Sequence, residues 1–153
     1  MSADKNKNNI NIKNRKAGFE YSFIDKYIAG IQLKGTEIKS IREGKAIIAD
    51  AFCVLNNDEL FVRNMNISEY KQGGIHNNHV PNRDRKLLLN KHEINKISSK
   101  LKDKGLTIVP LSLFVNEKGI AKLEIAIAKG KKLYDKRQDI KKKDIEREIA
   151  RKL

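Results

Sequence analysis

The fold of this chain is decided by the stretch 106-LTIVPLSLFVNEKGIAKLEIAIA-128. Two runs rich in aliphatic residues, Leu106–Val115 and Ile120–Ala128, flank the turn sequence Asn-Glu-Lys-Gly. In the second run apolar residues alternate with Lys122 and Glu124, which is the period of a strand with one buried face. The stretch therefore predicts an antiparallel hairpin and favours a fold built mainly from strands.

Further strands are expected upstream of this hairpin. Ala51–Leu55 and Leu60–Met65 flank Asn56-Asn57-Asp58, a composition typical of a tight hairpin turn. From Phe19 to Phe23 aromatic residues alternate with polar ones, which predicts another strand. Asp25-Lys26 is expected to turn the chain there, and the remaining expected strands are Tyr27–Leu33 and Leu87–Leu89.

Two helices are expected between the strands. Gly35-Thr36-Glu37 begins a short helix, and Gly44 ends it. Asn90 and Glu93 have the spacing of a capping box, so a longer helix is expected to follow them and to stop at Gly105.

Together these elements predict an α+β fold, mainly β with helices. We expect an OB-like antiparallel β-barrel of about six strands with one long and one short helix, because closure of a sheet removes its exposed edges. The stretch 66–85 is rich in Gly, Asn and Pro and is expected to be a long surface loop. The expected divisions are a disordered basic segment at 1–16, the barrel at 17–130 and a basic tail at 131–153.

The charge of the chain is concentrated at its two ends. Lys and Arg total 33 against 19 acidic residues, a net charge of +14, of which +4 lies in residues 1–16 and +6 in residues 129–153. Basic residues gain affinity for a polyanion by releasing its counterions, so a nucleic acid is the expected partner. The alternative is that the basic tails only keep the chain soluble. No apolar run in the sequence is long enough to cross a bilayer, which argues against a membrane.

Signals for catalysis or metal binding are weak. His76 and His79 lie in the expected loop and His92 on a polar helix face, so all three are expected to be exposed to solvent. Cys53 alternates with apolar residues and is expected to be a small core residue, and a single cysteine is typical of a cytoplasmic protein. Phosphate-binding glycine loops, nucleophile elbows and zinc motifs are absent from the sequence, so neither an enzyme nor a cofactor is expected.

Four blocks, taken in order, resemble the motifs of the SmpB family. They are 35-GTEIKSIREGKA-46, 81-PNRDRKLLLN-90, 105-GLTIVPL-111 and 128-AKGKKLYDKR-137. Their order and spacing agree from about Lys16 onward, so the resemblance covers nearly the whole chain. It implies a monomeric RNA-binding protein that binds the tRNA-like domain of transfer-messenger RNA and delivers it to stalled ribosomes for trans-translation.

The resemblance also implies which residues contact RNA. Contacts with transfer-messenger RNA are expected from Gly35, Glu37, Lys39, Ser40, Arg42, Lys45, Arg83, Arg85, Lys86, Asn90, Lys129, Gly130, Lys131 and Lys132. The tail is expected to be disordered when free and helical in the vacant mRNA channel, where it would contact the RNA of the small ribosomal subunit. Its expected contacts are Tyr134, Asp135, Lys136, Arg137, Lys141, Lys142, Lys143 and Arg147.

Some of these assignments have structural alternatives. Glu37 could instead pair with Lys39 or Arg42 on a solvated helix face, and Asn90 is first of all a helix cap. At the level of function, the alternatives are a general single-stranded RNA-binding OB module and a structural protein of the ribosome. The first of these would need exposed aromatic residues for base stacking, and Phe19, Tyr21 and Phe23 are the candidates.

Overall fold

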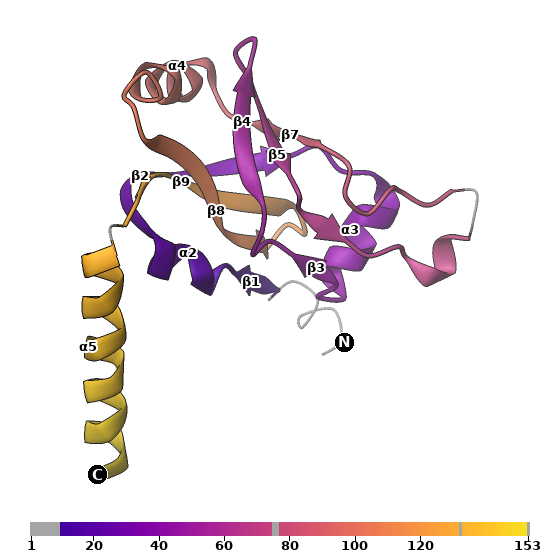
Figure 1. The fold of residues 1–153 in the computed structure, drawn as a ribbon. Helices are drawn as coiled ribbons and strands as arrows, with labels where there is room; N and C mark the ends of the chain where they lie inside the picture. Colours follow the sequence, from indigo (N-terminus) through magenta and orange to yellow (C-terminus); the bar gives the residue numbers. More distant parts are fainter. Residues whose placement is uncertain (1–9, 75–76, 132, 153) are drawn as a thin grey trace.

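A closed ring of six antiparallel strands forms the body of the molecule (Figure 1). The computed structural model describes residues 10–74, 77–131 and 133–152. The strands follow the order β8-β4-β5-β7-β2-β9, and β9 pairs back onto β8. Their bounds are Tyr21–Ile31 (β2), Phe52–Asn56 (β4), Glu59–Arg63 (β5), Arg85–Leu88 (β7), Leu106–Val115 (β8) and Ala121–Gly130 (β9). The OB-like arrangement predicted from the sequence is thus confirmed.

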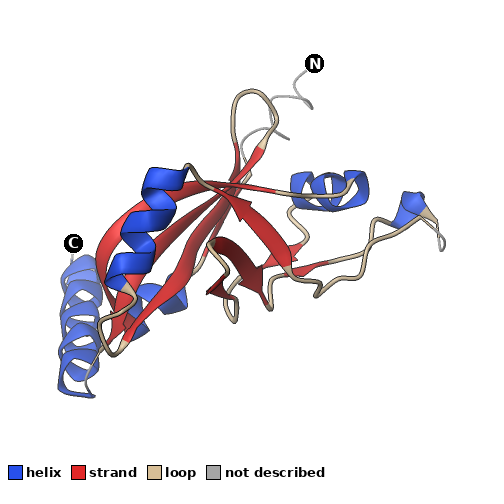
Figure 2. Cartoon of the chain, turned by 90° about the horizontal axis from the view of Figure 1, so that it is seen from above, coloured by secondary structure: helices blue, strands red, loops and turns tan. Residues whose placement is uncertain are grey.

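Shorter elements surround the ring. β1 (Asn11–Lys13) pairs with β8 outside the ring, and β3 (Ala46–Ile47) pairs with β6 (Asn66–Ile67) as a separate two-stranded sheet. The helices are α2 (Arg15–Glu20), α3 (Gly35–Arg42), α4 (Lys91–Lys100) and α5 (Leu133–Lys152), with a 3-10 turn, η1, at Lys71–Gly73. Figures 1 and 2 show α3 at one end of the ring, with α4 and α5 at the other.

Both predicted hairpins are present, and turn chemistry explains their registers. Asn57 and Asp58 have positive φ angles of 51° and 61°, a conformation that Asn and Asp tolerate better than most residues. In the second turn the side chain of Asn116 accepts hydrogen bonds from the backbone N–H groups of Lys118 and Ile120, at 3.0 and 2.9 Å. Gly119 completes this turn with a φ of +79°.

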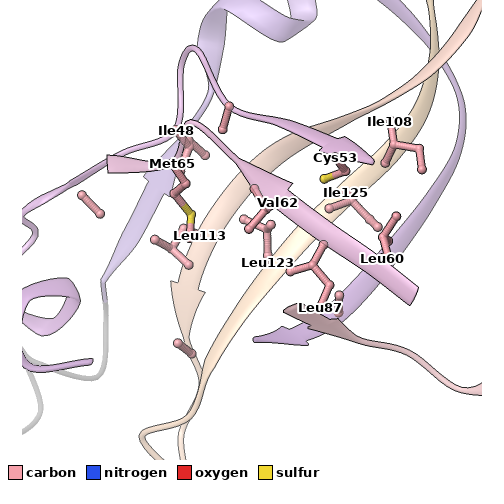
Figure 3. Close-up of a cluster of buried hydrophobic side chains, with 14 of the residues drawn as sticks. Ile48, Cys53, Leu60, Val62, Met65, Leu87, Ile108, Leu113, Leu123 and Ile125 are labelled. Carbon is pink, nitrogen blue, oxygen red and sulfur yellow. The ribbon is translucent and has the colours of Figure 1, made fainter. Parts of the chain in front are cut away.

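The interior of the ring is filled by the inward-facing side chains of these strands (Figure 3). Leu60, Leu113, Leu123 and Ile125 are fully buried. Cys53 lies among them, as predicted, and burial raises the pKa of its thiol well above the ordinary value. This thiol is therefore a packing group.

Two predicted strands are in fact one. β2 runs without interruption from Tyr21 to Ile31, so the turn predicted at Asp25-Lys26 is wrong. β9 pairs with β2 along nearly its full length, and a register shift between Phe23 and Asp25 takes up the irregularity. Phe19 lies in α2 and not in a strand, so the number of helices is also larger than predicted.

Order begins earlier than predicted at the N-terminus. Residues 11–16 were expected to be disordered, but β1 pairs with β8 and α2 begins at Arg15. Residues 1–9 lie outside the described part of the chain. Asn14 joins these elements, since its side chain caps α2 by accepting from the N–H of Ala17 at 3.2 Å. Its amide also donates to the carbonyl of Pro110 at 2.9 Å, which attaches the N-terminus to β8.

The tail is a helix that projects away from the ring (Figure 1). The helical pattern predicted from Asp139 is present and begins earlier, at Leu133. The structure thus differs from the expectation that the free tail has no structure. The helix passes close to α2, where Lys143 Nζ lies 6.0 Å from the centre of the aromatic ring of Phe19.

Candidate nucleic-acid interface

One end of the ring carries α3 and the loop of residues 66–85. The first turn of α3 is closed by Glu37, whose Oε1 accepts from the backbone N–H of Lys34 at 2.8 Å. At its other end Arg42 donates to the carbonyl of Gly119 at 3.0 Å, in the turn between β8 and β9. The helix is therefore capped at its first turn and fixed to the β8–β9 turn at its last.

Glu37 lies at the centre of this end and is fully buried. Arg83 contacts it through Nε, 3.1 Å from each carboxylate oxygen, and through Nη2 at 2.5 Å from Oε1. Arg85 donates to the other oxygen through Nε. The alternative from the sequence is wrong, because Glu37 does not pair with Lys39 or Arg42. Two arginines of the loop segment enclose its carboxylate, so the structure does not present it at the surface for the expected RNA contact.

Arg85 is also fully buried, so the structure does not present its side chain at the surface for the expected RNA contact. Its Nη1 donates to the carbonyl of Met65 at 2.6 Å and to that of Arg83 at 3.2 Å, while Nη2 donates to Pro81 at 2.9 Å. A planar guanidinium has five N–H donors, and this one uses its fork to hold three carbonyls and a carboxylate. Arg85 therefore sets the path of the loop.

The pKa values of this cluster reflect the balance of burial and pairing. Burial by itself raises the pKa of Glu37, but hydrogen bonds from Arg83, from the backbone of Lys34 and from Arg85 outweigh it. The pKa of Glu37 thus lies below its ordinary value. Burial lowers the pKa of Arg85, although Glu37 opposes that effect. Both groups are charged at neutral pH.

His79 is a second buried polar residue that connects the loop to neighbouring elements, and sequence reasoning missed it. It was expected to be exposed, and instead it is 2% exposed, with ring nitrogens 2.8 Å from the Thr36 hydroxyl and 2.8 Å from the carbonyl of Ile67. A carbonyl only accepts, so Nε2 carries the proton, and in the neutral ring Nδ1 accepts from Thr36. The histidine thus links the loop to both α3 and β6. His92 is exposed as expected, and His76 lies outside the described residues.

The groups left at the surface of this end are fewer than predicted. Gly35, Lys39 and Lys45 are exposed, and Lys45 pairs with Glu43 at 3.1 Å. Arg83 keeps 27% of its side chain exposed. Ser40 is fully buried, so its side chain is not at the surface either. We define the α3 surface as Gly35, Lys39, Lys45 and Arg83 together with two residues that were not predicted, the partly buried Tyr70 and the exposed Lys71.

Tyr70 was missed because a single aromatic residue in a loop gives no periodic signal. Lys39 Nζ lies 5.5 Å from the centre of its ring. The backbone around it is held by Asn78, which donates to the carbonyl of Tyr70 at 2.7 Å and accepts from its N–H at 3.0 Å. An aromatic ring beside a lysine on a firmly held loop is suited to contact with bases and phosphates.

The other predicted RNA contacts lie away from the α3 surface. Lys86, in β7, pairs with Glu59 at 3.2 Å. Asn90 is the cap of α4, accepting from the N–H of Glu93 at 2.8 Å, as its structural alternative predicted. Both residues belong to the side of the ring that leads toward α4.

Lys129, Gly130 and Lys131 lie at the far end of β9. The strand runs from Ala121, beside the α3 end, to Gly130, and its rise of about 3.3 Å per residue separates Ala121 from Lys129 by roughly 26 Å. Lys129 and Gly130 are exposed. Lys131 donates from Nζ to the carbonyl of Gly18 at 3.1 Å. The structure therefore splits the predicted RNA contacts between two ends of the ring.

The predicted ribosome contacts all belong to α5 or its start. Arg137, Lys141, Lys142, Lys143 and Arg147 are exposed. Tyr134, Asp135 and Lys136 are part of the helix by their backbone, while Lys132 and the side chains of those three lie outside the described residues. Ile140, Ile145 and Ile149 are about half exposed, so α5 presents apolar as well as basic groups to solvent.

No cluster of three or more His, Cys, Asp or Glu side chains among the described residues could hold a metal ion. Among the same residues, no helix has the length and hydropathy that crossing a membrane requires.

A closed ring of short antiparallel strands with a basic surface at each end defines the class of small OB-like proteins with an appended basic helix. Residues 11–153 match the family model described as SmpB protein, and the chain belongs to this family. The SsrA-binding protein of Cytophaga hutchinsonii is 58% identical over 151 residues, covering 99% of this chain and 98% of that protein. The SsrA-binding protein of Thermosipho africanus is 50% identical over 136 residues, covering 89% and 91%.

A solved structure has the same fold. It is described as "tmRNA-SmpB: a journey to the center of the bacterial ribosome", and its matching chain is 43% identical with a TM-score of 0.68. The match covers 81% of this chain and 86% of the other.

Proposed function

We propose that this protein binds the tRNA-like domain of transfer-messenger RNA and delivers it to stalled ribosomes, so that incomplete peptides are tagged. Membership of the SmpB family supports this function, as do relatives named SsrA-binding protein that are similar over almost their whole length. The setting is the cytoplasm of a bacterium, and the protein acts as a monomer without catalytic chemistry or a cofactor.

The observation that carries the proposal for the RNA site is the buried cluster of Glu37, Arg83 and Arg85. A carboxylate without solvent exposure would be costly unless it were paired and hydrogen-bonded, and here two arginines hold it. The cluster locks α3 against the loop and leaves 27% of the Arg83 side chain exposed, at the same end of the ring as Lys39 and Tyr70. A prearranged surface of this kind loses little conformational entropy when it binds a structured RNA.

Glu37 and Arg85 thus act as positioning residues, and Lys39, Tyr70 and Arg83 contact the RNA. Gly35 allows close approach of the backbone to a ribose, since it has no side chain and the space around its Cα is open. Lys129 and the residues after it contribute phosphate contacts farther along the same RNA or on the ribosome.

The α5 helix serves the ribosomal step. Its exposed basic residues are suited to a channel walled by RNA phosphates, and Tyr134 stacks against a ribosomal base in this proposal. Tyr134→Ala should therefore impair peptide tagging more than RNA binding. Normal tagging by this variant would contradict the stacking role.

A general single-stranded RNA-binding function is not favoured by the aromatic residues. Tyr21 and Phe23 pack against a small second core formed by Ala17, Val109 and Ala128, and Phe19 belongs to a helix. The three rings therefore do not form the exposed row that successive bases would need.

The deciding experiment is a filter-binding titration of the tRNA-like domain, with an elongator tRNA as competitor, at several salt concentrations. Preference for the tRNA-like domain that survives moderate salt is expected. Equal binding of both RNAs, with the steep salt dependence of phosphate contacts alone, would contradict the proposed function.

A further inference from the structure

The long loop between β6 and β7 is folded back on itself. Near its base the N–H of Ile67 donates to the carbonyl of Pro81 at 3.0 Å, and the carbonyl of Ile67 accepts from Nε2 of His79 at 2.8 Å. Farther out, Asn78 joins the two sides through its bonds with the backbone of Tyr70, at 2.7 and 3.0 Å. These bonds make the two sides of the loop into one unit. We call this unit the arm and define it as residues 67–74 and 77–81.

The arm extends past α3, away from the strands of the ring (Figure 1). Thr36, in the first turn of α3, meets the arm at two points. The hydroxyl of Thr36 lies 2.8 Å from Nδ1 of His79, and its methyl carbon would lie only 3.0 Å from a Cβ atom added at Gly73. Carbon atoms that are not bonded to each other pack at about 3.5–4.0 Å, so the lack of a side chain at Gly73 lets the arm lie directly on Thr36.

The groups of the α3 surface are divided between the helix and the arm. Lys39 belongs to the helix, whereas Tyr70 and the exposed Lys71 belong to the arm. The two parts meet where Lys39 Nζ lies 5.5 Å from the ring centre of Tyr70. A surface made of two segments is arranged for its ligand only when their relative position is fixed. The contacts of Thr36 with the arm supply that fixed position.

The hydrogen bond between Thr36 and His79 is protected from water and has a defined direction. The imidazole is only 2% exposed, so water has little access to its nitrogens. Nε2 donates to Ile67 within the arm, which leaves Nδ1 of the neutral ring to accept from the Thr36 hydroxyl. A buried polar atom without a partner is costly, so a placement of the arm that separates these two groups is disfavoured.

We propose that Thr36 and His79 are positioning residues for RNA binding, because their hydrogen bond fixes Tyr70 and Lys71 relative to α3. The inference rests on the proposed function, in which the α3 surface holds the tRNA-like domain. It assigns part of that affinity to two side chains that do not contact the RNA. Lys71 reaches a phosphate, and Tyr70 a base or a ribose, only when the arm is seated on Thr36.

The first test is Thr36→Val in the full chain, which removes the hydroxyl and keeps a methyl group facing Gly73. Affinity for the tRNA-like domain, measured by filter binding at several salt concentrations, should fall about five-fold at about 0.2 M salt, which corresponds to about 1 kcal/mol. The slope of log affinity against log salt should also decrease by about one, because Lys71 no longer holds its phosphate contact. The substitution itself removes no charge, so a shallower slope reports a lysine that has moved.

Control variants separate positioning from a general loss of structure. Thr36→Ser keeps the hydroxyl and should restore most of the lost affinity. His79→Gln, whose amide can still donate to Ile67, removes the same bond from its other side and should weaken binding to a similar extent. Thr107→Val makes the same chemical change in β8, beside Ala128 near the α5 end of the ring, and should bind as the wild type does. Circular dichroism spectra that match the wild type show that each variant is folded.

A double-mutant cycle decides whether Thr36 acts through the arm. Tyr70→Ala with Lys71→Gln removes the two groups that the arm contributes to the α3 surface. When Thr36→Val is added to this variant, the affinity should change by less than about two-fold, because the groups that Thr36 positions are already absent. Direct contact of Thr36 with the RNA, or a purely structural role, would weaken binding by about five-fold again, and that result would overturn the proposal.

Two further outcomes separate this inference from the proposed function. Wild-type affinity and salt dependence in both Thr36→Val and His79→Gln would overturn the positioning role and leave the proposed function intact. Failure of the unmodified protein to prefer the tRNA-like domain over an elongator tRNA would overturn the proposed function itself.

Discussion

At the scale of single residues, Glu37 is a fully buried carboxylate that joins α3 to the loop. Its carboxylate accepts from the backbone of α3 and from two arginines that follow the long loop. Removing two charges from water is costly, and the cost is offset here because nearly every lone pair and donor of the cluster is used. The cluster holds α3, β7 and the loop in one arrangement.

Glu37→Gln should lower the free energy of unfolding by about 3–5 kcal/mol, the usual cost of breaking a buried ion pair. The amide cannot balance two guanidinium groups, one of which is fully buried. Urea denaturation measures the loss. Glu43→Gln is the matched control, because it removes only a surface pair with Lys45 and should cost less than about 1 kcal/mol. Similar losses in both variants would show that burial of the cluster contributes little.

The stability conferred by Glu37 should depend on pH in the acid range. The pKa of Glu37 in the folded state is lowered, whereas in the unfolded chain it is about 4.3. Its contribution is therefore complete above the unfolded pKa and is lost as the pH falls through the folded pKa. The gap in unfolding free energy between wild type and Glu37→Gln should be constant from neutral pH to about pH 5.5 and narrow below about pH 4. A gap that does not narrow on acidification would contradict this assignment.

At the scale of elements, the N-terminal segment shows how one side chain attaches a short strand and a short helix to the ring. β1 has only three residues and α2 only six, so neither would be stable alone. Asn14 is buried between them and bonds to the carbonyl of Pro110 in β8. Polar residues are common at helix caps, but the side chain of Asn14 also hydrogen-bonds a backbone carbonyl of β8.

Asn14→Ala should therefore cost more than an ordinary cap. Loss of the cap accounts for about 1 kcal/mol, and the unpaired carbonyl in a buried position adds about 1–2 kcal/mol. Asn90→Ala is the comparison, because Asn90 caps α4 at an exposed position and should cost only about 1 kcal/mol. Chemical denaturation of both variants checks the difference, and equal losses would mean that the bond to Pro110 contributes nothing.

At the scale of the whole molecule, the ring and the tail are nearly independent. The pairing of β8 with β9 closes the ring. β9 ends at Gly130, and α5 begins after it, at Leu133. Every described side chain of α5 from Ile140 to Ala150 is exposed, so the helix adds little to the core. Binding of the tRNA-like domain and action on the ribosome can therefore reside in different parts of the chain.

Removal of residues 135–153 should leave the affinity for the tRNA-like domain largely unchanged and abolish peptide tagging. The α3 surface and its buried cluster are untouched by this truncation. Filter binding and a tagging assay on the same preparation measure the two activities. Loss of most of the RNA affinity would contradict the separation of roles.

Local signals in the sequence determined the hairpins, the capped helices α3 and α4, the basic ends and the family. Each of these depends on residues a few positions apart, so periodicity and turn chemistry reveal them. Only the tertiary structure decided that β2 is one strand, that β1 and α2 are ordered, and that Glu37, Ser40, His79 and Arg85 are buried. Glu37 meets Arg85 across 48 positions of sequence, and a buried carboxylate has the same local sequence pattern as an exposed one. The separation of the basic residues to two ends was likewise decided by the closed ring, which carries β9 from one end to the other.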